Sequence, residues 1–147
     1  MTDQPSAYAG LWIRTAAVLI DTLVLVVITL PLLVAVYGIA DLHPSRIDLA
    51  GLADTLLSWG VPIVFTIAFW LYKQATPGKM AVGIKVVDAK TRNAMSFGQA
   101  IGRYLAYFIS MIPLGLGFIW AAFDPRKQGW HDKLAGTVVV RLDKARP

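Results

Sequence analysis

Apolar residues along this chain are gathered in long blocks, and the polar residues lie in the segments between them. The first block, residues 11–37, and the second, residues 55–72, are each long enough to span a bilayer, since a spanning helix needs roughly 17 residues or more. A third block, residues 104–123, is apolar but broken by proline and glycine. The pattern predicts two antiparallel spanning helices followed by a broken helical segment.

Two short β-branched stretches lie outside these blocks. Residues 80–93 contain VGIKVV at 82–87 followed by turn-forming residues, which is typical of a strand or a hairpin. The tail, residues 124–147, contains a second such stretch at 137–142. We expect the two stretches to meet on one side of the membrane. The predicted fold class is therefore an all-α membrane protein with a small cytoplasmic β element.

The third helical segment, residues 96–123, begins at Ser96, a residue type that favours the N-cap of a helix. It is interrupted by PLGLG, Pro113 to Gly117, and each half is too short to cross a bilayer alone. Two interpretations are open, a re-entrant hairpin or a single kinked crossing. The hairpin is preferred because it keeps the basic tail on the same side as the other basic segments.

Composition supports the bilayer interpretation. Hydrophobic residues make up 56% of the 147 residues and charged residues only 16%, whereas a soluble domain carries about 25% charged residues. The chain has no cysteine, which excludes disulfides and thiolate metal sites. Its net charge of +5 comes from basic residues that flank the apolar blocks. An anionic inner leaflet attracts such flanks, so the expected partner is the lipid bilayer and not nucleic acid.

The distribution of charge predicts the orientation. The loop at 38–54 carries three aspartates and a single arginine, whereas residues 73–103 carry six basic residues and one aspartate. By the positive-inside rule the second segment is cytoplasmic and the first is not. We therefore expect a multi-pass protein of the bacterial cytoplasmic membrane, with its N-terminus and C-terminal tail in the cytoplasm.

Asp21 lies inside the first apolar block, where a carboxylate costs about 3 kcal/mol on insertion scales. It could form a structural ion pair, bind a proton or cation, or remain protonated without a partner. Basic residues that could pair with it are Lys79, Arg103 and Lys133.

Arg14 shares a helix face with Asp21 but lies seven residues before it, about 10 Å along the axis. A direct pair within the helix is not expected, because helical side chains lean toward the N-terminus. We expect Arg14 to extend to the headgroups at the cytoplasmic surface. Gln99 and Arg103 are spaced i,i+4 and should project from one face of the third helix.

His131 and Asp132 are adjacent in the tail, within WHDKLAG. Neighbours on a helix face different directions, so they are not expected to form a dyad, and the favoured interpretation of His131 is an interfacial turn. The other histidine, His43, is predicted on the opposite side of the membrane, which argues against a shared metal site. No catalytic motif is present, so neither enzyme activity nor a cofactor is expected.

Three pieces of the chain resemble the RDD family of small bacterial membrane proteins over residues 7–142. WIRTAAVLID contains Arg14 and Asp21, TPGKMAVGIKVVDAKT is similar to the loop after the second helix, and WHDKLAGTVVV contains Asp132. The resemblance implies a single membrane domain with one arginine and two aspartates as its characteristic residues. It also implies a role connected with transport, which remains an analogy because fold does not determine function.

Two main hypotheses follow from these observations, beside a role in lipid handling, whose signature would be a bound lipid near the basic flanks. In the first, the protein is a component that exchanges monovalent cations for protons, with Asp21 as the carboxylate and Arg14, Asp132, Arg103, Lys79 and His131 around it. Such a pathway would need a homo-oligomer, because two spans and a hairpin form a thin wall. In the second, the protein is an assembly or regulatory subunit of a larger membrane protein, and the same charged residues are structural.

Overall fold

A computed structural model of the protein describes residues 7–37 and 56–142. The predicted loop at 38–54, with His43, and residue 55 lie outside this range. The described elements follow the chain in this order: helix α1 (Leu11–Tyr37), π-helix η2 (Leu56–Gly60), helix α3 (Val61–Lys73), helix α4 (Pro77–Ala81), strand β1 (Ile84–Asp88), helix α5 (Phe97–Met111), helix α6 (Leu116–Ile119), 3-10 helix η3 (Trp120–Ala122), helix α7 (Trp130–Ala135) and strand β2 (Thr137–Arg141).

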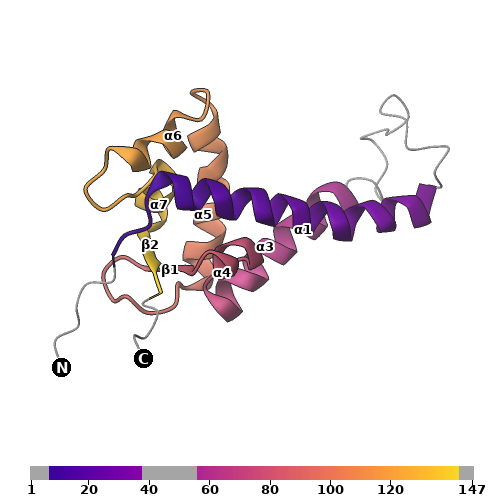
Figure 1. Ribbon diagram of the computed structural model, residues 1–147, viewed down its shortest axis with the longest axis horizontal. Coiled ribbons are helices and arrows are strands. Elements are labelled where there is room, and N and C mark those ends of the chain that lie inside the picture. Colours follow the sequence, from indigo (N-terminus) through magenta and orange to yellow (C-terminus); the bar gives the residue numbers. More distant parts are fainter. Residues whose placement is uncertain (1–6, 38–55, 143–147) are drawn as a thin grey trace.

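Helix α1 covers the same residues as the first apolar block and is long and apolar enough to cross a membrane. Its 27 residues correspond to about 40 Å. Figure 1 shows it extending beyond the rest of the described chain. Its large apolar side chains are exposed, among them Leu19, Leu23 and Val27, each more than 60% exposed. A helix of this kind is suited to contact with lipid.

The second apolar block is a π-turn, η2, that continues into the 13-residue helix α3. Trp70 near its end is fully buried. The helix ends at Gln74, which adopts a left-handed conformation and donates its backbone N–H to the Trp70 carbonyl. Among the described residues, α1 is the one unbroken helix that is long and apolar enough to cross a membrane.

Helix α5 begins as predicted at Ser96. The Ser96 hydroxyl accepts from the Gln99 N–H, and the Gln99 side chain accepts from the Ser96 N–H, which forms a capping box. The helix breaks after Met111, where Leu114 and Gly115 have positive φ, and the chain returns through α6 and η3 at an angle of 112°. The break lies in the predicted PLGLG stretch, and the bend excludes a straight helix.

Strands β1 and β2 pair antiparallel, with Val86 opposite Val139, which confirms the predicted small β element. The hairpin alternative for 80–93 is wrong. Residues 77–81 are helical, and Asp88 caps a tight turn after β1 by accepting the N–H groups of Lys90 and Thr91. Polar side chains that satisfy local backbone donors favour a turn over a second strand.

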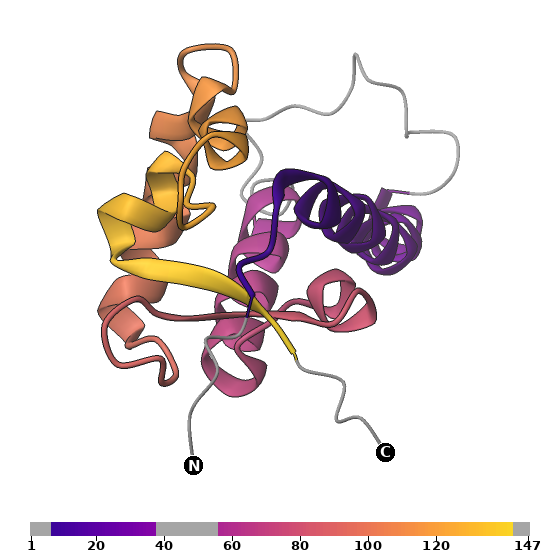
Figure 2. The same ribbon diagram turned by 60° about the vertical axis from the view of Figure 1, so that its left-hand side comes forward.

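The residues before α1 join the same ladder. Ala9 donates its N–H to the Val139 carbonyl, and Arg141 donates to the Ala7 carbonyl, both at 2.9 Å. Strand β2 therefore lies between two backbone segments, and its valines are all buried. Figure 2 shows β2 crossing beside the start of α1 and the end of α3. The packed core lies at this end of the molecule. Trp70, Ile84 and Val139 belong to one buried hydrophobic cluster there.

Candidate functional site

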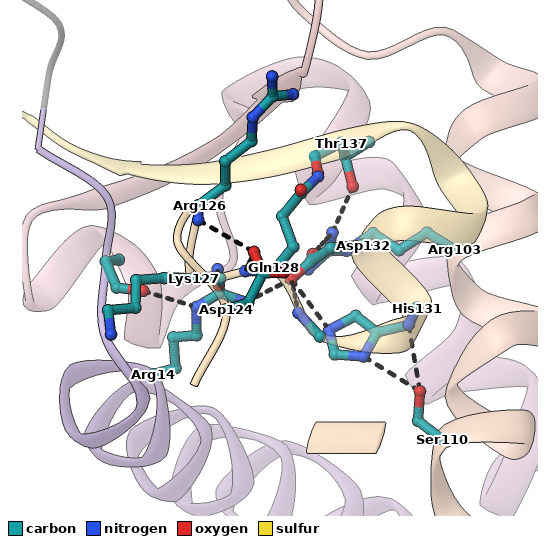
Figure 3. Close-up of polar contacts among 12 residues, drawn as sticks. Arg14, Arg103, Ser110, Asp124, Arg126, Lys127, Gln128, His131, Asp132 and Thr137 are labelled. Atoms are coloured by element: carbon teal, nitrogen blue, oxygen red, sulfur yellow. Dashed lines mark hydrogen bonds and ion pairs between the residues drawn. The ribbon is translucent and has the colours of Figure 1, made fainter. Parts of the chain in front are cut away.

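Asp132 is the centre of a buried network of charged residues. Helix α7 places it in its first turn, where it accepts the Gly129 N–H at 2.9 Å and so caps the helix. Its side chain is fully buried and forms ion pairs with Nη1 of Arg14, at 2.5 Å, and with Nη1 of Arg103. Figure 3 shows the three side chains converging from α1, α5 and α7. One carboxylate thereby joins three elements far apart in the sequence.

Arg14 also donates to two backbone carbonyls. Its Nη2 donates to Lys127 at 2.5 Å, and its Nε donates to Ala9 at 3.0 Å. The guanidinium group is largely buried, so the prediction that Arg14 extends to the headgroups is wrong. An arginine with several fixed acceptors forms a rigid fork that a surface-extended side chain does not provide.

Arg103 is almost completely buried in α5. In addition to Asp132 it donates to the Thr137 hydroxyl at 2.6 Å. Its guanidinium carbon lies 5.2 Å from the Trp70 ring and 5.7 Å from the Tyr107 ring, which are cation–π distances. Gln99, one turn earlier, donates to the Gly136 carbonyl at 3.4 Å, directly before Thr137, so Gln99 and Arg103 project from one face as predicted.

The pKa of Asp132 is set by this arrangement of charges. Burial by itself would raise the pKa of Asp132, but the guanidinium groups of Arg103 and Arg14 hold that pKa well below its ordinary value. The carboxylate is therefore ionised at neutral pH. Both of its oxygens already accept hydrogen bonds from protein donors, so Asp132 links α7 to α1 and α5.

Asp21 is held at a second point, against the loop that follows α3. Its Oδ1 accepts the Gly78 N–H at 2.7 Å, and its Oδ2 accepts the Thr76 hydroxyl. Nζ of Lys79 lies 4.0 Å from the same Oδ2. Of the three predicted candidates, Lys79 is therefore the ionic partner, whereas Arg103 pairs with Asp132 and Lys133 pairs with Asp124.

Gly78 is required by this contact. A Cβ at this position would lie 2.0 Å from the Ala17 carbonyl oxygen and 2.8 Å from Cγ of Asp21. Only a residue without a side chain allows the backbone of α4 to approach α1 so closely. The TPGK stretch thus supplies a hydroxyl, an N–H and an ammonium group to Asp21.

Lys79 lies in a nearly closed environment, with 7% of its surface exposed. It donates to the Thr76 hydroxyl at 3.2 Å. Burial lowers the pKa of Lys79 from its ordinary value, because desolvation disfavours the ammonium form.

His131 is buried, so its interpretation as part of an interfacial turn is wrong. Its Nδ1 lies 3.3 Å from the Ser110 hydroxyl, and its ring contacts Tyr107 and Phe118. Its Nε2 comes within 3.6 Å of Asp132, closer than the helical spacing suggested. Burial lowers the pKa of His131 to about 3, so the imidazole is neutral at physiological pH.

A cavity of about 530 Å³ brings most of these residues together between α1, α3 and α5. Five of the six predicted residues line it: Arg14, Asp21, Lys79, Arg103 and His131. Asp132 is absent from the lining. The rest of the wall is mostly apolar, with Val18, Leu25 and Phe65 as examples. The size and the mixture of polar and apolar groups are typical of ligand sites.

Sequence reasoning missed several residues of this site. Thr76, Ser110 and Thr137 are neutral, and nothing in their spacing connects them with a distant carboxylate. The aromatic residues Trp70 and Tyr107 were interpretable only as part of apolar blocks. The one available signal was Gly78, a glycine beside a proline in a conspicuous TPGK stretch. Across residues 7–37 and 56–142, no cluster of His, Cys, Asp or Glu could hold a metal ion.

A long apolar helix with exposed side chains, an apolar helix pair bent by 112° and a buried arginine–aspartate network are typical of a small membrane protein. Comparison with known proteins agrees. The model of the RDD family matches residues 8–136, and the chain belongs to that family.

One of the similar proteins is described as a membrane protein. The chain is 32% identical to the uncharacterized membrane protein YteJ of Bacillus subtilis (strain 168), over 91% of this chain and 81% of YteJ. It is 34% identical to the uncharacterized protein YxaI of the same organism, over 90% of this chain and 96% of YxaI. It is 44% identical to the uncharacterized protein RP437 of Rickettsia prowazekii (strain Madrid E), over 52% of this chain and only 42% of that protein. No solved structure matches the chain.

Proposed function

We propose that this membrane protein is a non-enzymatic assembly or regulatory subunit. The charged residues would hold a cytoplasmic cap, formed by the two strands and α7, on the membrane helices. The observation that carries this proposal is the complete burial of Asp132 between Arg14, Arg103 and the Gly129 N–H. A carboxylate saturated by protein donors has no free position for a transported ion. Its partner would be a larger membrane protein that contacts the cap or the exposed apolar helix faces.

The proposed orientation is consistent with the backbone contacts. The segment before α1, strand β1 after α3, and strand β2 in the tail form one ladder. They therefore lie on one side of the membrane, and the excess of Lys and Arg in this part favours the cytoplasm. With both ends of residues 97–136 on that side, α5 and α6 form a re-entrant hairpin, and η2 with α3 forms the second span.

A second candidate is cation and proton exchange through Asp21. One observation favours it, namely that Asp21 lines the cavity and its side chain is 15% exposed. The three cationic side chains at the same cavity oppose it, because they repel a cation. Passage would also require a homo-oligomer.

Two measurements on the same variant separate these candidates. Asp21→Asn keeps an oxygen for the Gly78 N–H but removes the charge that faces Lys79. A structural role predicts lower thermal stability in detergent, together with no cation-dependent proton flux in liposomes for wild type or variant. Wild-type flux that responds to sodium or potassium and disappears in the variant would instead establish exchange. Wild-type stability of the variant would contradict the structural role.

The partner role has its own test. Affinity purification of the full chain in mild detergent should recover a larger membrane protein in fixed stoichiometry. The same purification with Asp132→Asn should no longer recover this partner protein, because the cap is no longer held against the membrane helices. Recovery of the chain alone, with folding intact, would refute the partner role.

A further inference from the structure

The cavity between α1 and α3 carries more positive charge than the network around it can neutralise. Arg14, Lys79 and Arg103 line it, and among the described residues two carboxylates, Asp21 and Asp132, pair with them. With Lys79 protonated, one positive charge is in excess, and the neutral His131 does not change this balance. A buried charge without a counter-ion is costly, so the cavity favours an anionic occupant.

Hydrogen-bond donors are in excess as well. Lys79 has three N–H donors but makes one hydrogen bond, to Thr76, and an ion contact at 4.0 Å to Asp21. Within the described ranges, Nε of Arg103 and Nε1 of Trp70 also have no acceptor. An additional acceptor with several oxygens, such as a phosphate group, would complement this cluster.

The walls indicate that the anion is attached to an apolar chain. The α1 part of the lining includes Arg14 and Asp21 and, further along the helix, Leu25, and α3 contributes Phe65. Arg14 is in the first turns of α1, and Leu25 is about 16 Å further along its axis. In the proposed orientation the cationic end is therefore nearer the cytoplasmic surface than the apolar end. A phospholipid has the same order, with its headgroup at the surface and its acyl chains in the bilayer core.

The volume supports occupation. A volume of about 530 Å³ is within the range of ligand pockets. Val18, which lines the cavity, is 55% exposed, so the cavity can be reached from the exposed apolar face of α1. An anionic headgroup is also attracted to lysine and arginine near the membrane surface.

We propose that the cavity binds one anionic phospholipid, with its phosphate at Lys79 and Arg14 and an acyl chain between α1 and α3. This site is independent of whether the protein acts as a subunit or as a transporter. Lys79 would then act as a lipid ligand in addition to its contact with Asp21.

The test is native mass spectrometry of the full chain in neutral detergent, titrated with phosphatidylglycerol or with phosphatidylcholine of identical acyl chains. One phosphatidylglycerol should bind, roughly tenfold more tightly than phosphatidylcholine, a factor equal to about 1.4 kcal/mol. Lys79→Met should remove roughly this tenfold preference. The control Lys90→Met makes the same change in charge at an exposed turn outside the cavity and should bind as wild type.

A second pair of variants tests the acyl chain and does not depend on the folding of Lys79→Met. Thr66→Trp fills the cavity and should weaken phosphatidylglycerol by roughly tenfold or more. Val64→Trp adds the same bulk at a side chain that is 68% exposed and outside the cavity, and should have no effect.

The remaining outcomes overturn the proposal. Equal binding of the two lipids would refute the anionic headgroup. Competition by inorganic phosphate alone, with Thr66→Trp unaffected, would make the cavity a site for a free anion. A lipid-free dimer that Thr66→Trp disrupts would show that a second copy of the chain fills the cavity.

Discussion

Replacing Asp132 by asparagine is the most informative perturbation of this protein. The substitution preserves shape but removes the negative charge that faces Arg103, of which 1% is exposed, and Arg14. Breaking a buried ion pair by removing one partner costs about 3–5 kcal/mol, since the other charge remains buried without compensation. Against a typical total stability of about 5–15 kcal/mol, this loss is large. We therefore expect Asp132→Asn to unfold much more readily than wild type.

The assay is reversible unfolding of the purified protein in a fixed mixed micelle, followed by the fluorescence of its tryptophans. Asp88→Asn is the control. It makes the same chemical change at a half-buried turn residue whose amide oxygen can still accept the Lys90 and Thr91 N–H groups. The variant loses the hydrogen bond from Gln99 but leaves no buried cation without a counter-ion, so it should cost less than Asp132→Asn.

A double-mutant cycle gives the decisive number. Arg103→Met removes the cation, and in combination with Asp132→Asn it should cost less than the sum of the two single changes. Residues in direct contact show couplings of about 0.5–3 kcal/mol. Additive losses, or a cost for Asp132→Asn no greater than for Asp88→Asn, would refute the view that this pair holds the cap.

Three further changes test individual parts of the fold. Gly78→Ala should lower the free energy of unfolding by about 1–3 kcal/mol or more, because its Cβ would collide with the Ala17 carbonyl at 2.0 Å. The control Gly102→Ala, with nothing within 4 Å of its Cβ, should be neutral or stabilising. Equal thermal shifts of the two variants would contradict the close approach of α4 to α1. Stability should fall as pH drops from about 6.5 toward 3, since unfolding frees His131 to take up a proton that the folded ring with its pKa of about 3 does not bind. His131→Gln should flatten that part of the pH profile of the unfolding free energy, and an unchanged slope would exclude His131 as its source. Ser96→Ala should cost about 1 kcal/mol through loss of the helix cap, measured by thermal unfolding, and no loss would mean that the capping box is dispensable.

Several features could be read from local sequence because they depend on local physics. The extent of α1 follows from an uninterrupted apolar run, the start of α5 follows from the Ser96 cap, and its end follows from the proline and glycines that break a helix. The pairing of β1 with β2 was predictable as well, because two short β-branched runs were expected on one side of the membrane.

The partners of the charged residues could not be read in this way. A buried charge requires a counter-ion, but sequence does not specify which of several charges is brought near it. Asp21 had three candidate partners, and packing of α4 on α1 selected Lys79. Arg14 was expected at the lipid surface because its position permits it, yet a carboxylate 118 residues away binds it.

The sequence by itself determined that this is a membrane protein of the RDD family, where its long helix runs and that Asp21 places a carboxylate inside an apolar run, because the cost of placing polar groups in lipid depends on composition and spacing along the chain. Only the tertiary structure decided that Asp132 joins Arg14 to Arg103, that His131 is enclosed by aromatic rings, and that Lys79 and Asp21 share a cavity. These relations depend on distances between elements remote in sequence. Packing sets such distances, and no local pattern encodes them.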